Sequence, residues 1–202
     1  MNNLRFKNST ASYLTAILLT GATFAAACNS AAPPRATNDS GSQQRIPPRD
    51  QQAIDSASNV QVTKLDGGTF KLSDFRGKVV VVDFWATYCE PCKRLVPKLA
   101  ALDKKYRDRG LEVVGLTSDD KADQEKVLEF LKRAGADYTV GYENKWLASA
   151  FLKGTEDESG ESPIPQLFVL SREGRLVEHM IGENPQRVKD LEQVVSQQLA
   201  SR

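Results

Sequence analysis

The sequence predicts an α/β domain in which a central mixed β-sheet is flanked by helices. Strand-like and helix-like segments alternate as βαβα through the middle of the chain and finish as ββα, the order expected for a mixed sheet covered on both sides. Residues 79–84 read VVVVDF, a mostly β-branched run. Such a run is typical of a strand buried on both faces, so we place it at the centre of the sheet.

Two short strands are expected before the central one and a helix after it. Residues 60–65 and 69–72 are separated by an Asp-Gly-Gly turn, which predicts an N-terminal β-hairpin. Beyond the cysteines at 89 and 92, apolar side chains recur at helical spacing as far as Gly110. These side chains are Leu95, Leu99, Leu102 and Tyr106.

The next segments predict a second βα pair and then a third. A strand is expected over 111–116, followed by several N-cap candidates in 118–123. Val127, Leu128 and Leu131 form the apolar stripe of a helix that ends at Gly135. A short strand over 138–142 and a short helix over 145–152 complete the third pair.

The end of the domain has clear boundaries. Residues 166–170 and 175–181 flank a turn and predict an antiparallel hairpin. Asn184 is placed to cap a final helix whose first position is Pro185. One face of that helix carries Val188, Leu191, Val195 and Leu199.

Composition limits the function classes. At 202 residues, with 40% hydrophobic and 26% charged residues, the chain fits one ordinary domain with additional segments. A net charge of +1 and the lack of basic clusters interleaved with aromatic residues argue against nucleic-acid binding.

Residues 1–27 are predicted to be a signal peptide. Arg5 and Lys7 give a positive start, residues 11–27 are largely apolar, and three alanines precede Cys28. A retained membrane helix is the alternative, but the apolar stretch is shorter than the roughly 20 residues needed to span a bilayer. The protein is therefore expected to be exported, to the periplasm or the extracytoplasmic face of a membrane.

Cys28 after small residues resembles the lipobox of bacterial lipoproteins, which implies a lipid anchor on Cys28. Ala25 stands where that motif usually has a larger aliphatic residue, so cleavage that leaves a free thiol is the alternative. Residues 28–59 are rich in Ala, Pro, Ser, Gln and Asn, and predict a flexible linker. The folded domain is expected over residues 60–202, long enough for a sizeable core.

The chemistry of the chain is expected at Cys89-Glu90-Pro91-Cys92. Two cysteines this close at the start of a helix can close and reopen a disulfide, which makes a two-electron couple. The helix N-terminus favours the Cys89 thiolate, so Cys89 should attack and Cys92 should resolve the mixed disulfide. A zinc site would need further ligands, and the remaining candidates are His179 and the distant Cys28. A purely structural disulfide closing so short a loop would stabilise the fold only modestly.

The segment 82–93, VDFWATYCEPCK, resembles the active-site segment of the thioredoxins. The lead-in at 72–78, the CEPC sequence and the export signal are similar to the TlpA/ResA group of membrane-tethered thioredoxin-like proteins. This resemblance covers roughly residues 60–199. It implies a thioredoxin fold with an N-terminal β-hairpin and an inserted βα unit, and a thiol-disulfide oxidoreductase that uses no metal and no cofactor.

The resemblance also implies roles for residues around the cysteines. Trp85 corresponds to the tryptophan beside the site, and Pro97 to the proline that kinks the active-site helix. Pro165, and not Pro163, corresponds to the cis-proline that faces the cysteines. A cis-proline interrupts regular strand pairing and leaves the backbone of Ile164 free to bind an extended substrate.

Two positions bear on proton transfer. ResA-type proteins carry a glutamate three residues after the second cysteine, where this chain has Leu95. Asp83 occupies the place of the buried aspartate of thioredoxins. A buried carboxyl has a raised pKa and can take the proton from Cys92 as it attacks the mixed disulfide.

The resemblance favours reduction of disulfides in exported proteins, such as apocytochromes c, with electrons from a membrane dithiol donor. The direction of exchange depends on the redox potential, which the sequence leaves open. The acidic segment 154–162 precedes Pro165 and either selects basic partners or is an ordinary solvated loop.

Two other activities occur on the same fold. A thiol peroxidase would need a Pro-x-x-x-Thr/Ser-x-x-Cys motif, and residues 82–85 before Cys89 contain no proline. A copper carrier would need two cysteines separated by three intervening residues and a nearby histidine. Here two residues separate the cysteines, and His179 lies in the last hairpin.

Overall fold

The computed structural model describes residues 50–201. The expected signal peptide over residues 1–27, the expected lipid anchor at Cys28 and the linker up to residue 49 lie outside the described residues. In the part described, no helix is long and apolar enough to cross a membrane.

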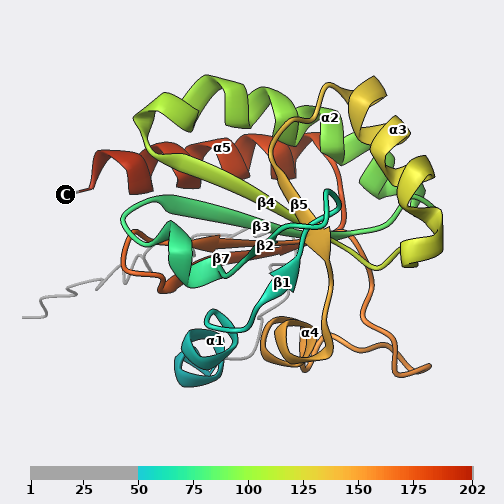
Figure 1. The fold of residues 1–202 in the computed structure, drawn as a ribbon. Coiled ribbons are helices and arrows are strands. Elements are labelled where there is room, and N and C mark those ends of the chain that lie inside the picture. Colours follow the sequence, from blue (N-terminus) through green and yellow to red (C-terminus); the bar gives the residue numbers. More distant parts are fainter. Residues whose placement is uncertain (1–49, 202) are drawn as a thin grey trace, which may run out of the picture. The chain divides into compact units, whose positions relative to one another are not determined.

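The centre of the domain is a five-stranded mixed sheet with the order β5-β4-β3-β6-β7 (Figure 1). β3 pairs in parallel with β4 and antiparallel with β6, so the predicted central strand lies in the middle. The strands are β3 (Val79–Trp85), β4 (Leu111–Thr117), β5 (Thr139–Tyr142), β6 (Gln166–Leu170) and β7 (Leu176–Ile181).

Helices cover both faces of this sheet. Figure 1 shows α2, α3 and α5 on one side and α1 and α4 on the other. Their bounds are α1 (Gln51–Ala57), α2 (Glu90–Tyr106), α3 (Gln124–Ala134), α4 (Lys145–Leu152) and α5 (Pro185–Ala200). Short 3-10 turns lie at Leu72–Phe75, Arg107–Arg109 and Lys121–Asp123.

The expected N-terminal hairpin is present as a small antiparallel sheet of β1 (Val62–Thr63) and β2 (Thr69–Phe70). It is joined to the edge of the main sheet, because Lys64 bridges to Gly141 and the Leu65 N–H donates to the Val140 carbonyl over 3.2 Å. Gly141 has no side chain to obstruct this approach: a Cβ there would lie 2.6 Å from Val62.

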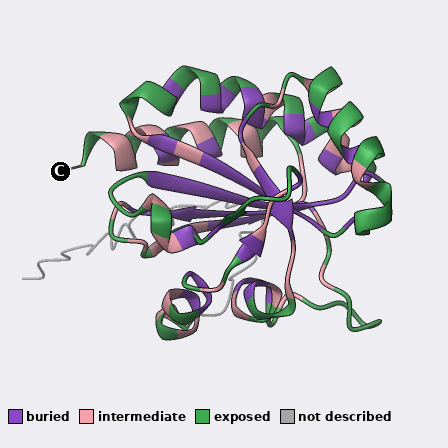
Figure 2. Cartoon of the chain, in the orientation of Figure 1, coloured by how far each residue is buried: buried purple, intermediate pink, exposed green. Residues whose placement is uncertain are grey.

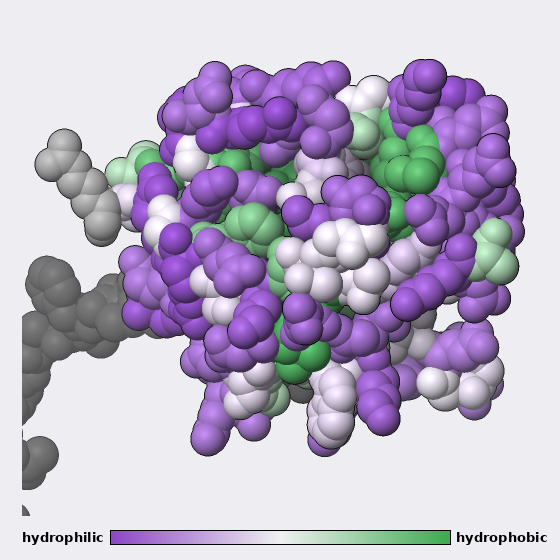
Figure 3. Space-filling model, in the orientation of Figure 1, coloured by the Kyte–Doolittle hydropathy of each residue, from purple (hydrophilic) through white to green (hydrophobic). Residues whose placement is uncertain are grey.

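Two separate hydrophobic cores form, one on each face of the sheet (Figure 2). The side chains of β3 alternate between them: Val79, Val81 and Trp85 pack under α2, and Val80, Val82 and Phe84 pack toward α1 and α4. The surface seen in Figure 3 is mainly hydrophilic, with hydrophobic side chains in small separate patches.

The start of the ordered domain differs from the expectation. The composition of residues 51–57 predicts part of a flexible linker, but these residues form α1, capped by the Asp50 side chain. Ile54 is 0% exposed and Ala57 is 5% exposed, so the helix packs one apolar stripe onto the core that also contains Val80, Val82 and Phe84. Two apolar residues three apart are enough to anchor a short helix, although the composition of the segment is otherwise polar.

The remaining element predictions hold with small shifts. Gly110 ends the 3-10 turn that follows α2, and Gly135 ends α3; both glycines have the left-handed conformation. Asn184 caps α5, and Pro185 lies in its first turn. Leu128 is 43% exposed, so it lies off the buried stripe of α3 that Val127 and Leu131 form.

Candidate active site

Cys89 and Cys92 are joined by a disulfide, with Cα atoms 5.2 Å apart. Cys89 is the N-cap of α2, and its sulfur accepts the Cys92 backbone N–H over 3.2 Å. Cys92 is 0% exposed whereas Cys89 is 8% exposed. The unpaired N–H groups at the helix start stabilise a thiolate at Cys89, which is also the sulfur that a partner can reach.

The first turn of α2 holds the two residues between the cysteines. Pro91 lies where a missing N–H costs no hydrogen bond. Glu90 points to solvent and pairs with Lys93 over 2.7 Å; the hydrogen bond and charge of Lys93 lower the pKa of the carboxyl. Pro97 lies inside α2, the position that the resemblance to thioredoxins implies for it.

A cis peptide bond joins Ile164 and Pro165, as predicted for this pair and not for Pro163. The Ile164 carbonyl oxygen lies 3.5 Å from the Cys89 sulfur. Within residues 50–201, Ile164 makes no backbone–backbone hydrogen bond. An extended chain could therefore pair with the Ile164 backbone without displacing a backbone hydrogen bond seen in these residues.

Gln166 holds this proline loop in place from within the sheet. Its side-chain N–H groups donate to the Pro163 carbonyl over 2.8 Å and to the Thr155 hydroxyl over 2.9 Å. Its carbonyl oxygen lies 2.7 Å from the Nε2 atom of His179, which stacks on Phe168. His179, considered above as a metal ligand, thus belongs to a buried support of the loop.

Asp83 lies in β3, on the face covered by α2, and is 0% exposed. Neither carboxyl oxygen has a hydrogen-bond partner among the described residues. Burial raises the pKa of Asp83 from its ordinary value of 3.8 to about 8. A carboxyl with such a pKa can exchange a proton near neutral pH, which is what deprotonation of a thiol requires.

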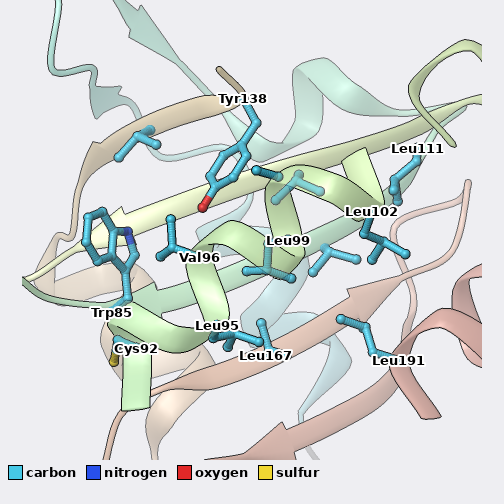
Figure 4. Packing of buried hydrophobic residues seen from close by; sticks show 14 of the residues in the cluster. Trp85, Cys92, Leu95, Val96, Leu99, Leu102, Leu111, Tyr138, Leu167 and Leu191 are labelled. Atoms are coloured by element: carbon cyan, nitrogen blue, oxygen red, sulfur yellow. The ribbon is translucent and has the colours of Figure 1, made fainter. Parts of the chain in front are cut away.

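Two further predictions about this face concern Trp85 and Leu95. Trp85 is 0% exposed and packs against Phe130 of α3, with ring centroids 5.5 Å apart. It therefore supports the site from inside and presents no surface to a substrate. Leu95 is 1% exposed and belongs to the core beneath α2 (Figure 4), so an apolar side chain fills the position where the ResA pattern has glutamate.

A buried carboxylate, which the sequence patterns do not identify, fixes the loop before Cys89. Asp119 accepts the Thr87 N–H over 2.8 Å, the Thr87 hydroxyl over 2.5 Å and the Thr117 hydroxyl over 2.6 Å. The sequence places Asp119 only among several helix-cap candidates, because the contact that defines its role joins loops 32 residues apart.

Tyr88 is a second residue that the sequence patterns do not single out; it is 67% exposed directly before Cys89. An exposed aromatic ring beside a nucleophile can contact a partner protein. The acidic segment is likewise on the surface: Asp157 organises it by accepting the Ser159 N–H over 2.8 Å, and Glu156, Glu158 and Glu161 are exposed. Residues 50–201 contain no cluster of three or more His, Cys, Asp or Glu side chains that could hold a metal ion.

Three comparisons with known proteins agree with this geometry. The model of the Redoxin family matches residues 52–195, a span that begins inside α1. The thiol-disulfide oxidoreductase ResA of Bacillus anthracis is 32% identical over 127 residues, which cover 63% of this chain and 68% of that protein. ResA of Bacillus subtilis (strain 168) is 29% identical over 126 residues, covering 62% and 65%.

Among solved structures, the chain resembles a putative thiol:disulfide interchange protein DsbE from Chlorobium tepidum. The TM-score is 0.58 at 29% identity, over 71% of this chain and 95% of that chain. The likeness confirms the thioredoxin fold expected from the sequence.

Proposed function

Because the chain belongs to the Redoxin family and is a thiol-disulfide oxidoreductase, we propose that it reduces disulfide bonds in exported proteins. The observation that carries this proposal is the position of the Cys89 sulfur, 3.5 Å from the Ile164 carbonyl beside the cis-proline. A substrate strand bound along Ile164 would place its disulfide against the more accessible sulfur of the pair.

The reaction starts from the reduced pair. The Cys89 thiolate attacks one sulfur of the substrate disulfide, forming a mixed disulfide and releasing the other substrate sulfur as a thiolate. Asp83 then takes the proton of the Cys92 thiol, and the Cys92 sulfur attacks Cys89. The bond between Cys89 and the substrate breaks, the second substrate thiolate leaves, and two electrons have passed to the substrate.

The oxidised pair must be reduced for another turnover. A membrane dithiol donor is the partner that fits, since it can attack the same accessible Cys89 sulfur. We assign residues 1–27 to a signal peptide, and Cys28 to a lipid anchor that keeps the enzyme at the extracytoplasmic face of a membrane. Tyr88 and the acidic segment 154–162 flank the site in sequence and are assigned to contacts with partner proteins.

The test of the activity is reduction of insulin disulfides, followed as turbidity with a dithiol present. The parent protein is expected to accelerate the reaction, and the Cys89→Ser and Cys92→Ser variants are expected to lose this acceleration. Equal rates in the parent and both variants would contradict the assignment. Anchoring is tested separately: Cys28→Ala should release the protein from the membrane fraction, and retention there would contradict the lipid anchor.

A further inference from the structure

Three buried polar side chains under α2 have no hydrogen-bond partner among the described residues. The side chains are those of Asp83, Trp85 and Tyr138, and the groups without a partner are both carboxyl oxygens of Asp83, the indole N–H and the phenol hydroxyl. Asp83 and Trp85 are 0% exposed and Tyr138 is 8% exposed. Buried polar atoms in proteins are almost always satisfied by protein or by ordered water, so three such groups in one region point to a common partner.

Gly115 lets these groups share one space. It is the β4 residue paired with Asp83 of β3 in the sheet register. A Cβ at this position would lie 3.0 Å from the Trp85 Nε1 atom and 3.3 Å from the Tyr138 Cε2 atom. Figure 4 shows the indole nitrogen and the phenol hydroxyl turned toward the same region beside α2. Any larger residue at 115 would fill the approach between the polar groups.

Burial and nearby carboxyls determine the protonation state of Tyr138. Burial raises the pKa of Tyr138 well above 10, and the nearby carboxyls Asp83 and Asp103 raise it further. The phenol is therefore neutral, and its hydroxyl can donate one hydrogen bond and accept another. Of these two carboxyls, Asp103 is paired with Arg107, and Asp83 has no partner in the part of the chain that the structure describes.

We propose that Tyr138 is a positioning residue for Asp83, whose carboxyl it reaches through one buried water molecule. The water accepts the Tyr138 O–H and the Trp85 N–H and donates to the Asp83 carboxylate, so all three groups gain a partner. This arrangement stabilises ionised Asp83, the form that takes the proton of Cys92. The inference rests on the role proposed above for Asp83, and Tyr138 itself gains or loses no proton in the reaction.

The test is the titration of the Asp83 carboxyl in the oxidised protein, followed by carbon-13 NMR of labelled aspartate. Tyr138→Phe removes one donor from the network, so the pKa of Asp83 should rise by about one unit. Tyr142→Phe is the matched control. The Tyr142 hydroxyl is also buried without a hydrogen-bond partner in residues 50–201, but it lies near Asp119 instead. Tyr142→Phe should leave the Asp83 titration unchanged.

The bound water is tested in the parent protein, which removes any dependence on folding of the variant. The Trp85 indole N–H should show a cross-peak to a long-lived water in NMR, while the 63% exposed Trp146 exchanges with bulk solvent. An unchanged Asp83 pKa in Tyr138→Phe, or no such cross-peak, would overturn the inference and leave the proposed function standing. Failure of the role proposed for Asp83 would show in a different experiment. In that case the Asp83→Asn variant would keep the parent's pH dependence of disulfide exchange.

Discussion

Asp83 and Phe84 are neighbours in β3, and both side chains are 0% exposed, but they point to opposite faces of the sheet. Phe84 lies in an aromatic cluster, with ring centroids 5.9 Å from Phe151 and 5.7 Å from Phe168. Asp83 lies on the other face, where its oxygens find no partner among the described residues.

Phe84 and Asp83 are equally buried, but they have opposite effects on the stability of the fold. The face covered by α1 and α4, which holds Phe84, gains stability from apolar contact, the largest favourable contribution to folding. The face covered by α2 carries the Asp83 carboxyl, whose ionisation burial disfavours, so ionised Asp83 costs stability. The proposed mechanism uses the proton exchange of this carboxyl. Apolar packing at Phe84 therefore offsets part of the cost of burying the Asp83 carboxyl.

Removing the Phe84 ring tests the contribution of the aromatic cluster to stability. Phe84→Ala should lower the free energy of unfolding by about 3–5 kcal/mol, because a large cavity is left among Phe151 and Phe168. Denaturation in urea measures this loss. Any folded protein should keep the parent's pH profile for disulfide exchange, and an altered profile would show that the two faces are not independent.

Replacing the carboxyl has the opposite effect on stability. The folded pKa of Asp83, about 8, exceeds its ordinary value of 3.8, so the parent loses stability as the pH rises from about 4 to about 8. Asp83→Asn lacks this titration. The variant should be the more stable protein at pH 7, by an upper bound on the order of 4 kcal/mol, with the difference vanishing near pH 4.

The same substitution should slow the resolving step. In the parent, release of substrate from the mixed disulfide should accelerate as the pH rises through about 8, when Asp83 ionises. In Asp83→Asn the step should be slower by about 10²-fold and lack this acceleration. Stopped-flow measurement of the step at several pH values checks both; a gain in activity together with the gain in stability would contradict the trade-off.

Asp119 sharpens the comparison, since it is a buried carboxyl whose hydrogen bonds are satisfied. Asp119→Ala leaves the Thr87 N–H and two hydroxyls without their acceptor, and should cost about 1–3 kcal/mol of stability. Thermal unfolding of Asp119→Ala and Asp83→Asn side by side tests the contrast. Stabilisation by both substitutions would show that hydrogen bonding is not what separates the two carboxyls.

The smallest effect is expected at the surface. Tyr88→Ala should raise the KM for a protein disulfide by roughly threefold while kcat changes little, because the ring contributes binding area and no chemistry. Trp146→Ala is the matched control: Trp146 is 63% exposed, close to the 67% of Tyr88, but lies on α4. Equal changes in KM for both variants would remove Tyr88 from the substrate surface.

Much of this architecture follows from local sequence patterns. The β-branched run predicted β3 and the burial of Asp83 within it, because apolar neighbours on both sides leave a central strand no exposed face. Asn184 and Pro185 predicted the start of α5 for an equally local reason. The short helix α1 was missed since its apolar stripe contains only Ile54 and Ala57.

Other parts of the site depend on sheet register and loop contacts, which no local pattern encodes. The grouping of Asp83 with Gly115 and Tyr138 requires the pairing of β3 with β4 and the start of β5 beside it. The anchoring of Thr87 by Asp119 requires the ends of two parallel strands to meet. Family resemblance supplied the cis bond at Pro165, which composition and spacing do not predict.

The most direct test of the account is which single-cysteine variant traps a substrate. Cys92→Ser keeps the attacking sulfur and removes the resolving one, so it should accumulate a mixed disulfide between Cys89 and its partner, detectable by mass spectrometry. Cys89→Ser should accumulate none. Trapping by Cys89→Ser and not by Cys92→Ser would contradict the assignment of Cys89 as the attacking sulfur.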